Sequence, residues 1–153
     1  MKHFKPIFLL VAFCSFALLS CKKDCLDHCT VTKKDIRLDG RQEVPARDTR
    51  AKGKAEVTYN KCDKTLTYSI SWSNLTGVPT GAHIHGPAPR GQNASIKHDF
   101  FNLIPKTSSG TFTNSVKLDD TAIKEDSLLG GYYYFNFHSA KFPGGEIRGQ
   151  IEF

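Results

Sequence analysis

The segment Thr65–Ser73 constrains the fold of this chain more than any other stretch of its sequence. Apolar residues occupy every second position, Leu66, Tyr68, Ile70 and Trp72, and only threonine and serine lie between them. Successive side chains of a β-strand point to opposite faces, so a period of two predicts a strand with one buried face. A helix would spread the same apolar residues around its circumference and could not bury them together.

A second alternating segment, Gly53–Tyr59, comes shortly before the first. The polar stretch Asn60–Lys64 separates the two, and this arrangement predicts an antiparallel hairpin. Thr121–Leu129 has no strand period, and we expect a short helix or a loop there. Further short segments are strand candidates: Ile36–Leu38, Ala82–His85, Ser95–Leu103, Thr111–Leu118, Tyr132–His138 and Ile147–Phe153.

About eight short strands at regular spacing predict an all-β fold, an antiparallel Greek-key sandwich or barrel, immunoglobulin-like or superoxide-dismutase-like. The length of 153 residues fits a single domain with a tail. Hydrophobic residues make up 39% and charged residues 24%, which excludes a disordered chain and a multi-span membrane protein. The sequence contains no long amphipathic helix, so a parallel sheet with crossover helices is not expected.

Residues 1–20 are predicted to be a signal peptide. A basic start precedes the apolar run Pro6–Leu19, which is too short for a full membrane span. The run ends in Leu18–Cys21 (LLSC), which resembles the bacterial lipobox, where the cysteine is diacylated and becomes the new N-terminus. We therefore expect lipidation at Cys21. A plain secretory signal or an uncleaved anchor is the alternative interpretation.

The lipobox implies a protein of the bacterial cell envelope, held to a membrane by its N-terminal lipid. Lys22 favours the outer membrane, since an aspartate at that position resembles a retention signal of the inner membrane. We expect residues 21–34 to be a lipidated tether and residues 35–153 to be the domain. The formal net charge is +6, but acidic residues intersperse the basic ones, so nucleic acid is not an expected partner. An envelope protein or a glycan remains a candidate partner.

Three cysteines remain if the signal peptide leaves and Cys21 carries lipid: Cys25, Cys29 and Cys62. An odd number in an oxidising compartment predicts one disulfide and one free thiol. Cys62 lies in the predicted hairpin turn, so a bridge from Cys25 or Cys29 would tie the tail to the domain. A metal site from the two tail cysteines and His28 is the competing interpretation, but no fourth ligand is evident.

The pair His83 and His85 is the best candidate for chemistry. Residues two apart on a strand share a face and lie about 6.6–6.8 Å apart along the chain. His138 ends another predicted strand, and a third imidazole would complete a site that suits copper or zinc. His98 is a weaker fourth candidate. The alternative is that these histidines only bond backbone carbonyls at the end of the sheet.

From about Ile36 to Phe153 the chain resembles the CHRD (chordin) domain family, which is β-rich and extracellular. The segments that carry the resemblance stand in family order: Leu38–Pro45 (LDGRQEVP), Thr65–Tyr68, Asn74–Gly77, Ala82–Ala88 (AHIHGPA), Asn136–Ser139 and Phe142–Gln150 (FPGGEIRGQ). Glu146 and Arg148 alternate with Ile147, and we expect both to point outward and to pair across strands.

The His-x-His strand also resembles the copper strand of the copper/zinc superoxide dismutases, which are Greek-key barrels. The bridging histidine and the zinc loop of those enzymes are not recognisable here. We therefore expect a lipid-anchored extracytoplasmic binding module, with copper or zinc at His83, His85 and His138, and favour this function over catalysis. The alternatives are a copper-dependent oxidoreductase and an adhesion or protein-interaction domain with structural histidines.

Overall fold

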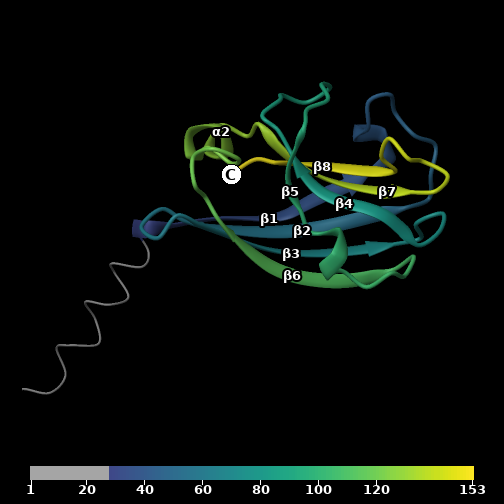
Figure 1. Ribbon diagram of the computed structural model, residues 1–153. Helices are drawn as coiled ribbons and strands as arrows, with labels where there is room; N and C mark the ends of the chain where they lie inside the picture. The colour runs from purple at the N-terminus through teal and green to yellow at the C-terminus, as the bar shows by residue number, and fades with distance from the viewer. Residues whose placement is uncertain (1–27) are drawn as a thin grey trace, which may run out of the picture.

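Eight antiparallel strands form one curled sheet, a half-barrel, in the computed structural model, which describes residues 28–153 (Figure 1). The expectation of an all-β antiparallel fold is confirmed. The strands are β1 (Thr30–Asp39), β2 (Lys52–Asn60), β3 (Thr65–Ser73), β4 (Pro79–His85), β5 (Ile96–Asp99), β6 (Gly110–Lys117), β7 (Tyr133–Ser139) and β8 (Ile147–Ile151). The helical elements are η1 (Gly40–Gln42), η2 (Phe101–Leu103) and the short α2 (Glu125–Leu129).

The strand order across the sheet is β5-β4-β7-β8-β1-β2-β3-β6. The hairpin expected around residues 60–64 joins β2 and β3, with Tyr59 opposite Leu66. The chain then crosses from β3 to β4, which pairs with β7, while β6 returns to pair with β3. These crossovers give the sheet two halves, β1-β2-β3-β6 and β5-β4-β7-β8, that lie one above the other in Figure 1.

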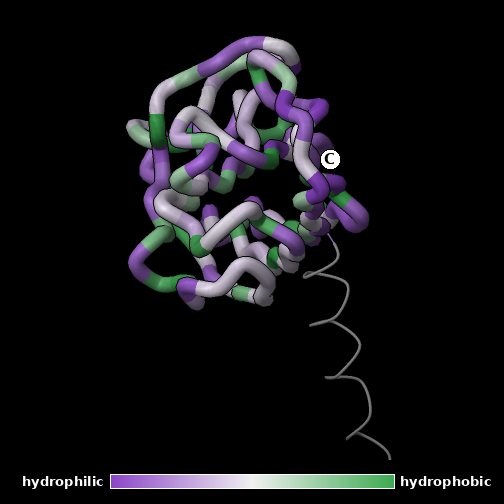
Figure 2. The backbone as a smooth tube through the Cα atoms, turned by 90° about the vertical axis from the view of Figure 1, so that its right-hand side faces the viewer, coloured by the Kyte–Doolittle hydropathy of each residue, from purple (hydrophilic) through white to green (hydrophobic). Residues whose placement is uncertain are grey.

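The alternating segments bury their apolar faces as predicted. In β3, Leu66, Tyr68, Ile70 and Trp72 are all buried, at most 3% exposed. In β7, Phe135 and Phe137 face the same core, and this core lies between the two halves of the sheet. Figure 2 shows hydrophobic and hydrophilic positions mixed along the backbone. Burial of these aromatic and aliphatic side chains supplies the main driving force for the fold.

Side chains join the two edges of the curled sheet, β5 and β6. The ring of Phe100, directly after β5, stacks on Phe112 of β6 with centroids 6.0 Å apart. The hydroxyl of Tyr68 lies 3.1 Å from Nε2 of His98, and Asn114 of β6 donates to the same hydroxyl. The predicted strand Ser95–Leu103 is shorter in the structure, because the chain turns into η2 after Phe100.

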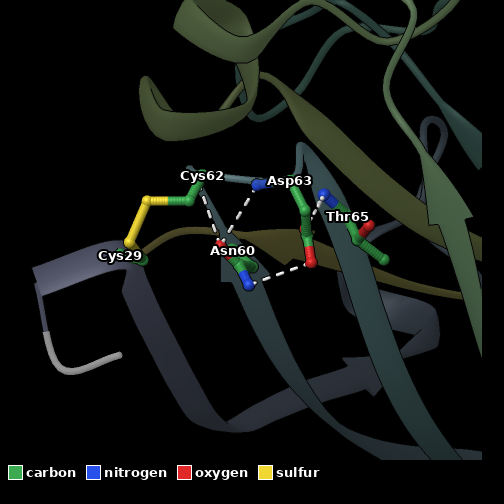
Figure 3. Close-up of a disulfide and its surroundings, with 5 residues drawn as sticks. All are labelled: Cys29, Asn60, Cys62, Asp63 and Thr65. Atoms are coloured by element: carbon green, nitrogen blue, oxygen red, sulfur yellow. Dashed lines mark hydrogen bonds between the residues drawn. A yellow bond between two sulfur atoms is a disulfide. The ribbon is translucent and has the colours of Figure 1, made fainter. Parts of the chain in front are cut away.

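A disulfide joins Cys29 to Cys62, which settles the choice between the two partners considered for Cys62 (Figure 3). It fastens the start of β1 to the turn between β2 and β3, where Asn60 accepts from the backbone N–H of Cys62. The sheet begins at Thr30, so residues 30–34, expected to belong to the tether, are part of β1. Residues 30–33 pair with residues 57–60 of β2, which extends one residue beyond the predicted strand end at Tyr59.

The predicted signal peptide, the lipidation site Cys21 and Cys25 lie outside the described residues. Within residues 28–153, no helix is both long enough and apolar enough to cross a membrane.

Candidate metal centre

Strands β4 and β7 place the three candidate histidines on the outer face of the sheet. Ala82 and Ile84 of β4 are fully buried in the core, so His83 and His85 point the other way. On β7, His138 lies opposite Gly81 in the β4 pairing. The strand parity that predicted a shared face is therefore observed, and the pairing of the two strands supplies the third imidazole.

One ring nitrogen from each of His83, His85 and His138 lies within 4.8 Å of the other two. The closest pair is Nδ1 of His83 and Nε2 of His138, which are 3.1 Å apart. The centroids of the His83 ring and the His85 ring are 5.3 Å apart. Nitrogen atoms at these separations can converge on a single ion after small side-chain rotations.

Backbone carbonyls fix which nitrogen of two of these rings carries the proton. Nδ1 of His85 lies 2.9 Å from the carbonyl oxygen of Ala94, and Nδ1 of His138 lies 2.8 Å from that of Pro143. A carbonyl oxygen only accepts, so both Nδ1 atoms donate and both Nε2 atoms carry a lone pair. The Nε2 atom of His85 is buried and has no hydrogen-bond partner among the described residues.

Burial lowers the pKa of all three histidines. The pKa of His83 falls to about 4, chiefly through burial and then through the neighbouring His138. Burial is also the largest cause of the lowered pKa values of His85 and His138. The cluster is therefore neutral at pH 7, which leaves its nitrogen lone pairs available to a metal ion.

Gly81 makes room for the two closest rings. A Cβ at this position would lie 2.8 Å from Cε1 of His83 and 3.0 Å from Cδ2 of His138. The first contact is shorter than real Cβ atoms show and the second is tight, so a larger residue here would displace the two rings from these positions. Gly81 is a site residue that strand parity alone does not identify.

The fourth histidine considered, His98, does not belong to the cluster. It lies opposite Ile84, and its Nε2 atom lies 3.1 Å from the hydroxyl of Tyr68, which belongs to the core. Its neighbour Asp99 lies opposite His83 instead, with a carboxylate oxygen 3.8 Å from Nε2 of His83. Strand pairing therefore gives the cluster an acidic neighbour in place of a fourth imidazole.

Beside the cluster lies a buried polar region that the sequence did not reveal. The carboxylate of Glu43, only 6% exposed, accepts from the side-chain amide of Asn136 over 2.5 Å. Burial raises the pKa of Glu43 to about 7, against the opposing effects of Asn136, Arg148 and Arg47. The only advance sign of this region was the position of Glu43 in one of the segments, LDGRQEVP, noted above.

Glu146 and Arg148 do not pair on an open surface as we expected, because loops cover the outer face of β8. Glu146 is fully buried and accepts from the hydroxyl of Thr49 and from the backbone of Thr76. The guanidinium of Arg148, 1% exposed, lies 3.4 Å from the centroid of the Tyr134 ring. The Tyr134 ring also stacks on His85 with centroids 5.1 Å apart.

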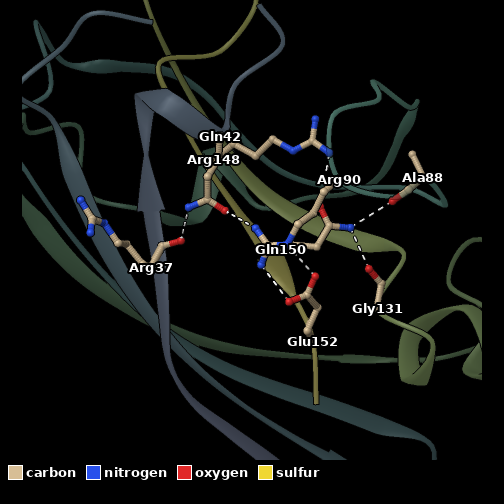
Figure 4. A network of polar contacts seen from close by, with 8 residues as sticks. All are labelled: Arg37, Gln42, Ala88, Arg90, Gly131, Arg148, Gln150 and Glu152. Atoms are coloured by element: carbon tan, nitrogen blue, oxygen red, sulfur yellow. Dashed lines mark hydrogen bonds and ion pairs between the residues drawn. The ribbon is translucent and has the colours of Figure 1, made fainter. Parts of the chain in front are cut away.

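A polar network fastens these covering loops to β8 (Figure 4). Gln150 donates to the carbonyl oxygens of Ala88 and Gly131 and accepts from Arg148. Arg90 in the same loop forms a double hydrogen bond with Glu152. The loop that carries Ala94 is thereby held over the sheet, which positions the carbonyl that orients His85.

The family model of the CHRD domain matches residues 35–151. No curated protein and no solved structure matches the chain.

Proposed function

The chain belongs to the CHRD domain family. Because three histidines of its domain lie together, we propose that it binds one copper or zinc ion in the cell envelope. The observation that carries this proposal is the buried Nε2 atom of His85, which has no hydrogen-bond partner within residues 28–153 and belongs to a ring clustered with two further imidazoles. A buried polar atom without a partner is costly unless a ligand satisfies it.

The proposed ligand atoms are Nε2 of His85, Nε2 of His138 and Nδ1 of His83. The first two carry lone pairs because their Nδ1 atoms donate to carbonyls. His83 would bind through Nδ1 after its proton moves to Nε2, where the carboxylate of Asp99 lies 3.8 Å away. Acceptors behind metal-binding imidazoles usually fix ring orientation in this way. Three neutral imidazoles leave a coordination position open and suit Cu(II) or Zn(II).

Metal analysis of the full-length protein, purified without a histidine tag and equilibrated with Cu(II) or Zn(II), tests the proposal. We expect about one ion per chain, lost when His83, His85 and His138 are all changed to alanine. The matched control is His98→Ala, which removes a half-buried histidine outside the cluster and should keep the ion. A folded wild-type protein without bound ion would make the histidines structural, and a protein or glycan partner would then be sought.

A copper-dependent oxidoreductase is the second candidate function, and the observation that favours it is the set of three imidazoles, which would leave a coordination position open on a bound ion. Redox catalysis by copper needs such a position for the substrate. The copper-loaded protein would then turn over superoxide or peroxide. Inactivity of a fully loaded sample in both assays would leave metal binding as the function.

We also propose that Cys21 is lipidated, which would hold the domain close to a membrane. Thr30, the first residue of β1, follows Cys21 by nine positions. A chain of that length spans at most about 32 Å, so the domain would sit directly above the headgroups. Cys21→Ser should abolish metabolic labelling with a radioactive fatty acid and release the protein from membranes, whereas Cys25→Ser should change neither.

A further inference from the structure

A pocket of about 140 Å³ lies beside the histidine cluster on the outer face of the sheet, and His85, Tyr134 and Asn136 line it together with Glu43 and Gly144. It has room for at least about four water molecules. His85 is the only member of the cluster that lines the pocket. Asn93 and Ala94 complete the lining, so the pocket walls come from the regions around residues 43, 85–94 and 134–144.

The strand pairing shows that the pocket adjoins the position of the ion. Asn136 lies opposite His83 across the β4–β7 pair and two residues before His138, so its side chain is next to both. The three ligand nitrogens face one another over this part of the sheet. The amide of Asn136 also donates to Glu43, and both side chains line the pocket.

Gly145 leaves the space that this carboxyl group occupies. Its φ is +122°, which favours glycine, and a Cβ there would lie 2.7 Å from both carboxylate oxygens of Glu43. The segment Phe142–Gln150, near the end of the matched family region, thus meets the segment Leu38–Pro45, near its start, at the buried side chain of Glu43. Burial of this carboxylate is unfavourable for its charged form.

With a divalent ion bound, the surroundings of the pocket are positively charged. The three histidines are neutral, and the charges of Arg148 and Arg47 both act on Glu43. Nη2 of Arg47 would lie 3.4 Å from a Cβ at Gly144. Two guanidinium groups and a divalent metal ion outweigh the carboxylates of Glu43 and Asp99, so the pocket favours a small anion.

Building on the metal site proposed above, we propose that this pocket admits a small anion of at most about four heavy atoms, which binds directly to the ion held by His83, His85 and His138. Glu43 and Asn136 line the pocket beside the ion and select ligands by size and hydrogen bonding. The site would thus be a metal centre with a dedicated position for an exchangeable ligand.

Azide titration of the Cu(II)-loaded full-length protein at pH 8 tests this inference. We expect azide to give a charge-transfer absorption band with the wild type. Gly144→Leu fills the pocket at a position where an added Cβ meets only Arg47, and it should weaken azide binding at least about tenfold while one copper ion stays bound. The matched control is Gly77→Leu, because Gly77 has open space around it and does not line the pocket; this variant should bind azide like the wild type.

Glu43→Gln provides a second variant that does not depend on filling the pocket. It removes a negative charge close to the anion, so azide should bind several-fold more tightly at pH 8. Copper without an azide band, or unchanged azide affinity in both Gly144→Leu and Glu43→Gln, would overturn the inference and leave the metal site standing. A wild-type protein that holds no copper would overturn the metal site and this inference together.

Discussion

The Nδ1 atom of His83 lies 3.1 Å from the Nε2 atom of His138, on neighbouring strands. Since His138 uses its own Nδ1 to donate to the carbonyl of Pro143, the proton between the two rings belongs to His83. This hydrogen bond closes the cluster when no ion is present. An ion held between the rings would take the place of that proton, and Nε2 of His83, near Asp99, is the nitrogen that would then carry it.

Asp99→Asn should weaken metal binding by roughly tenfold, because the carboxylate near Nε2 of His83 favours the tautomer that binds through Nδ1. The Cu(II) dissociation constant, measured by competition with a chelator, reports this change. Asp48→Asn, a substitution at an exposed aspartate elsewhere in the chain, should have no effect. Equal affinities for all three proteins would contradict a role of Asp99 in orienting His83.

Gly81→Ala should also weaken metal binding at least about tenfold without removing any ligand. The added methyl group would press on the rings of both His83 and His138 and force them apart. The same chelator competition measures the loss, and circular dichroism verifies that the sheet is intact. Gly77→Ala, where nothing lies within 4 Å of an added Cβ, is the control and should bind like the wild type.

The stability of the domain should depend on pH through Glu43. The folded state holds the proton of Glu43 up to about pH 7, whereas the unfolded chain releases it near pH 4.5. The folded state binds more protons between these values, so the free energy of unfolding falls as the pH rises through this window. The loss is complete above pH 7 and amounts to at most about 3 kcal/mol.

Glu43→Gln lacks this titration and should gain stability relative to the wild type from pH 4 to pH 8. Urea unfolding at a series of pH values gives the difference directly. Glu56→Gln, at a more exposed glutamate on β2, should follow the wild type. A constant difference between Glu43→Gln and the wild type across this range would show that Glu43 is not protonated in the folded state.

Removal of the disulfide by Cys62→Ser should destabilise the domain by roughly 3–4 kcal/mol, the cost predicted from loop-closure entropy. Cys29 and Cys62 are 33 residues apart in the sequence, and the bridge limits the freedom of the unfolded chain between them. Urea unfolding under non-reducing conditions measures the change. Cys25→Ser should leave the stability unchanged, since Cys29 is the partner; a large loss in that variant would contradict the assigned pairing.

Phe100→Ala should cost about 3–5 kcal/mol of stability, a typical loss for a buried phenylalanine. Its ring, 1% exposed, packs against Phe112 and Phe137 and joins the two edges of the sheet. Leu103→Ala removes a side chain that is 59% exposed in the adjoining η2 and should have little effect. Similar unfolding free energies for the two variants would show that the edges do not depend on this contact.

The sequence by itself determined the strands with a clear period of two and the face on which their side chains lie. Alternation in Thr65–Ser73 predicted the buried residues of β3. The same parity predicted that His83 and His85 share one face of their strand while Ile84 faces the core. These predictions depend only on the period of an extended chain, which is a local property. The hairpin at residues 60–64 could be predicted for the same reason, because it depends on a local polar stretch between two alternating segments.

Only the tertiary structure decided what lies beside these histidines. Pairing of β4 with β7 brings His138 to the cluster, whereas His98 faces the core opposite Ile84. The carbonyls of Ala94 and Pro143 determine which nitrogen atoms of His85 and His138 carry no proton. Both carbonyls belong to loops, whose course cannot be predicted from a repeating sequence pattern. Glu43 and Arg148 are charged residues at positions that would be exposed on an isolated strand or loop. Their burial follows from loops folding over the outer face of the sheet, and such long-range packing leaves no repeating pattern in the sequence.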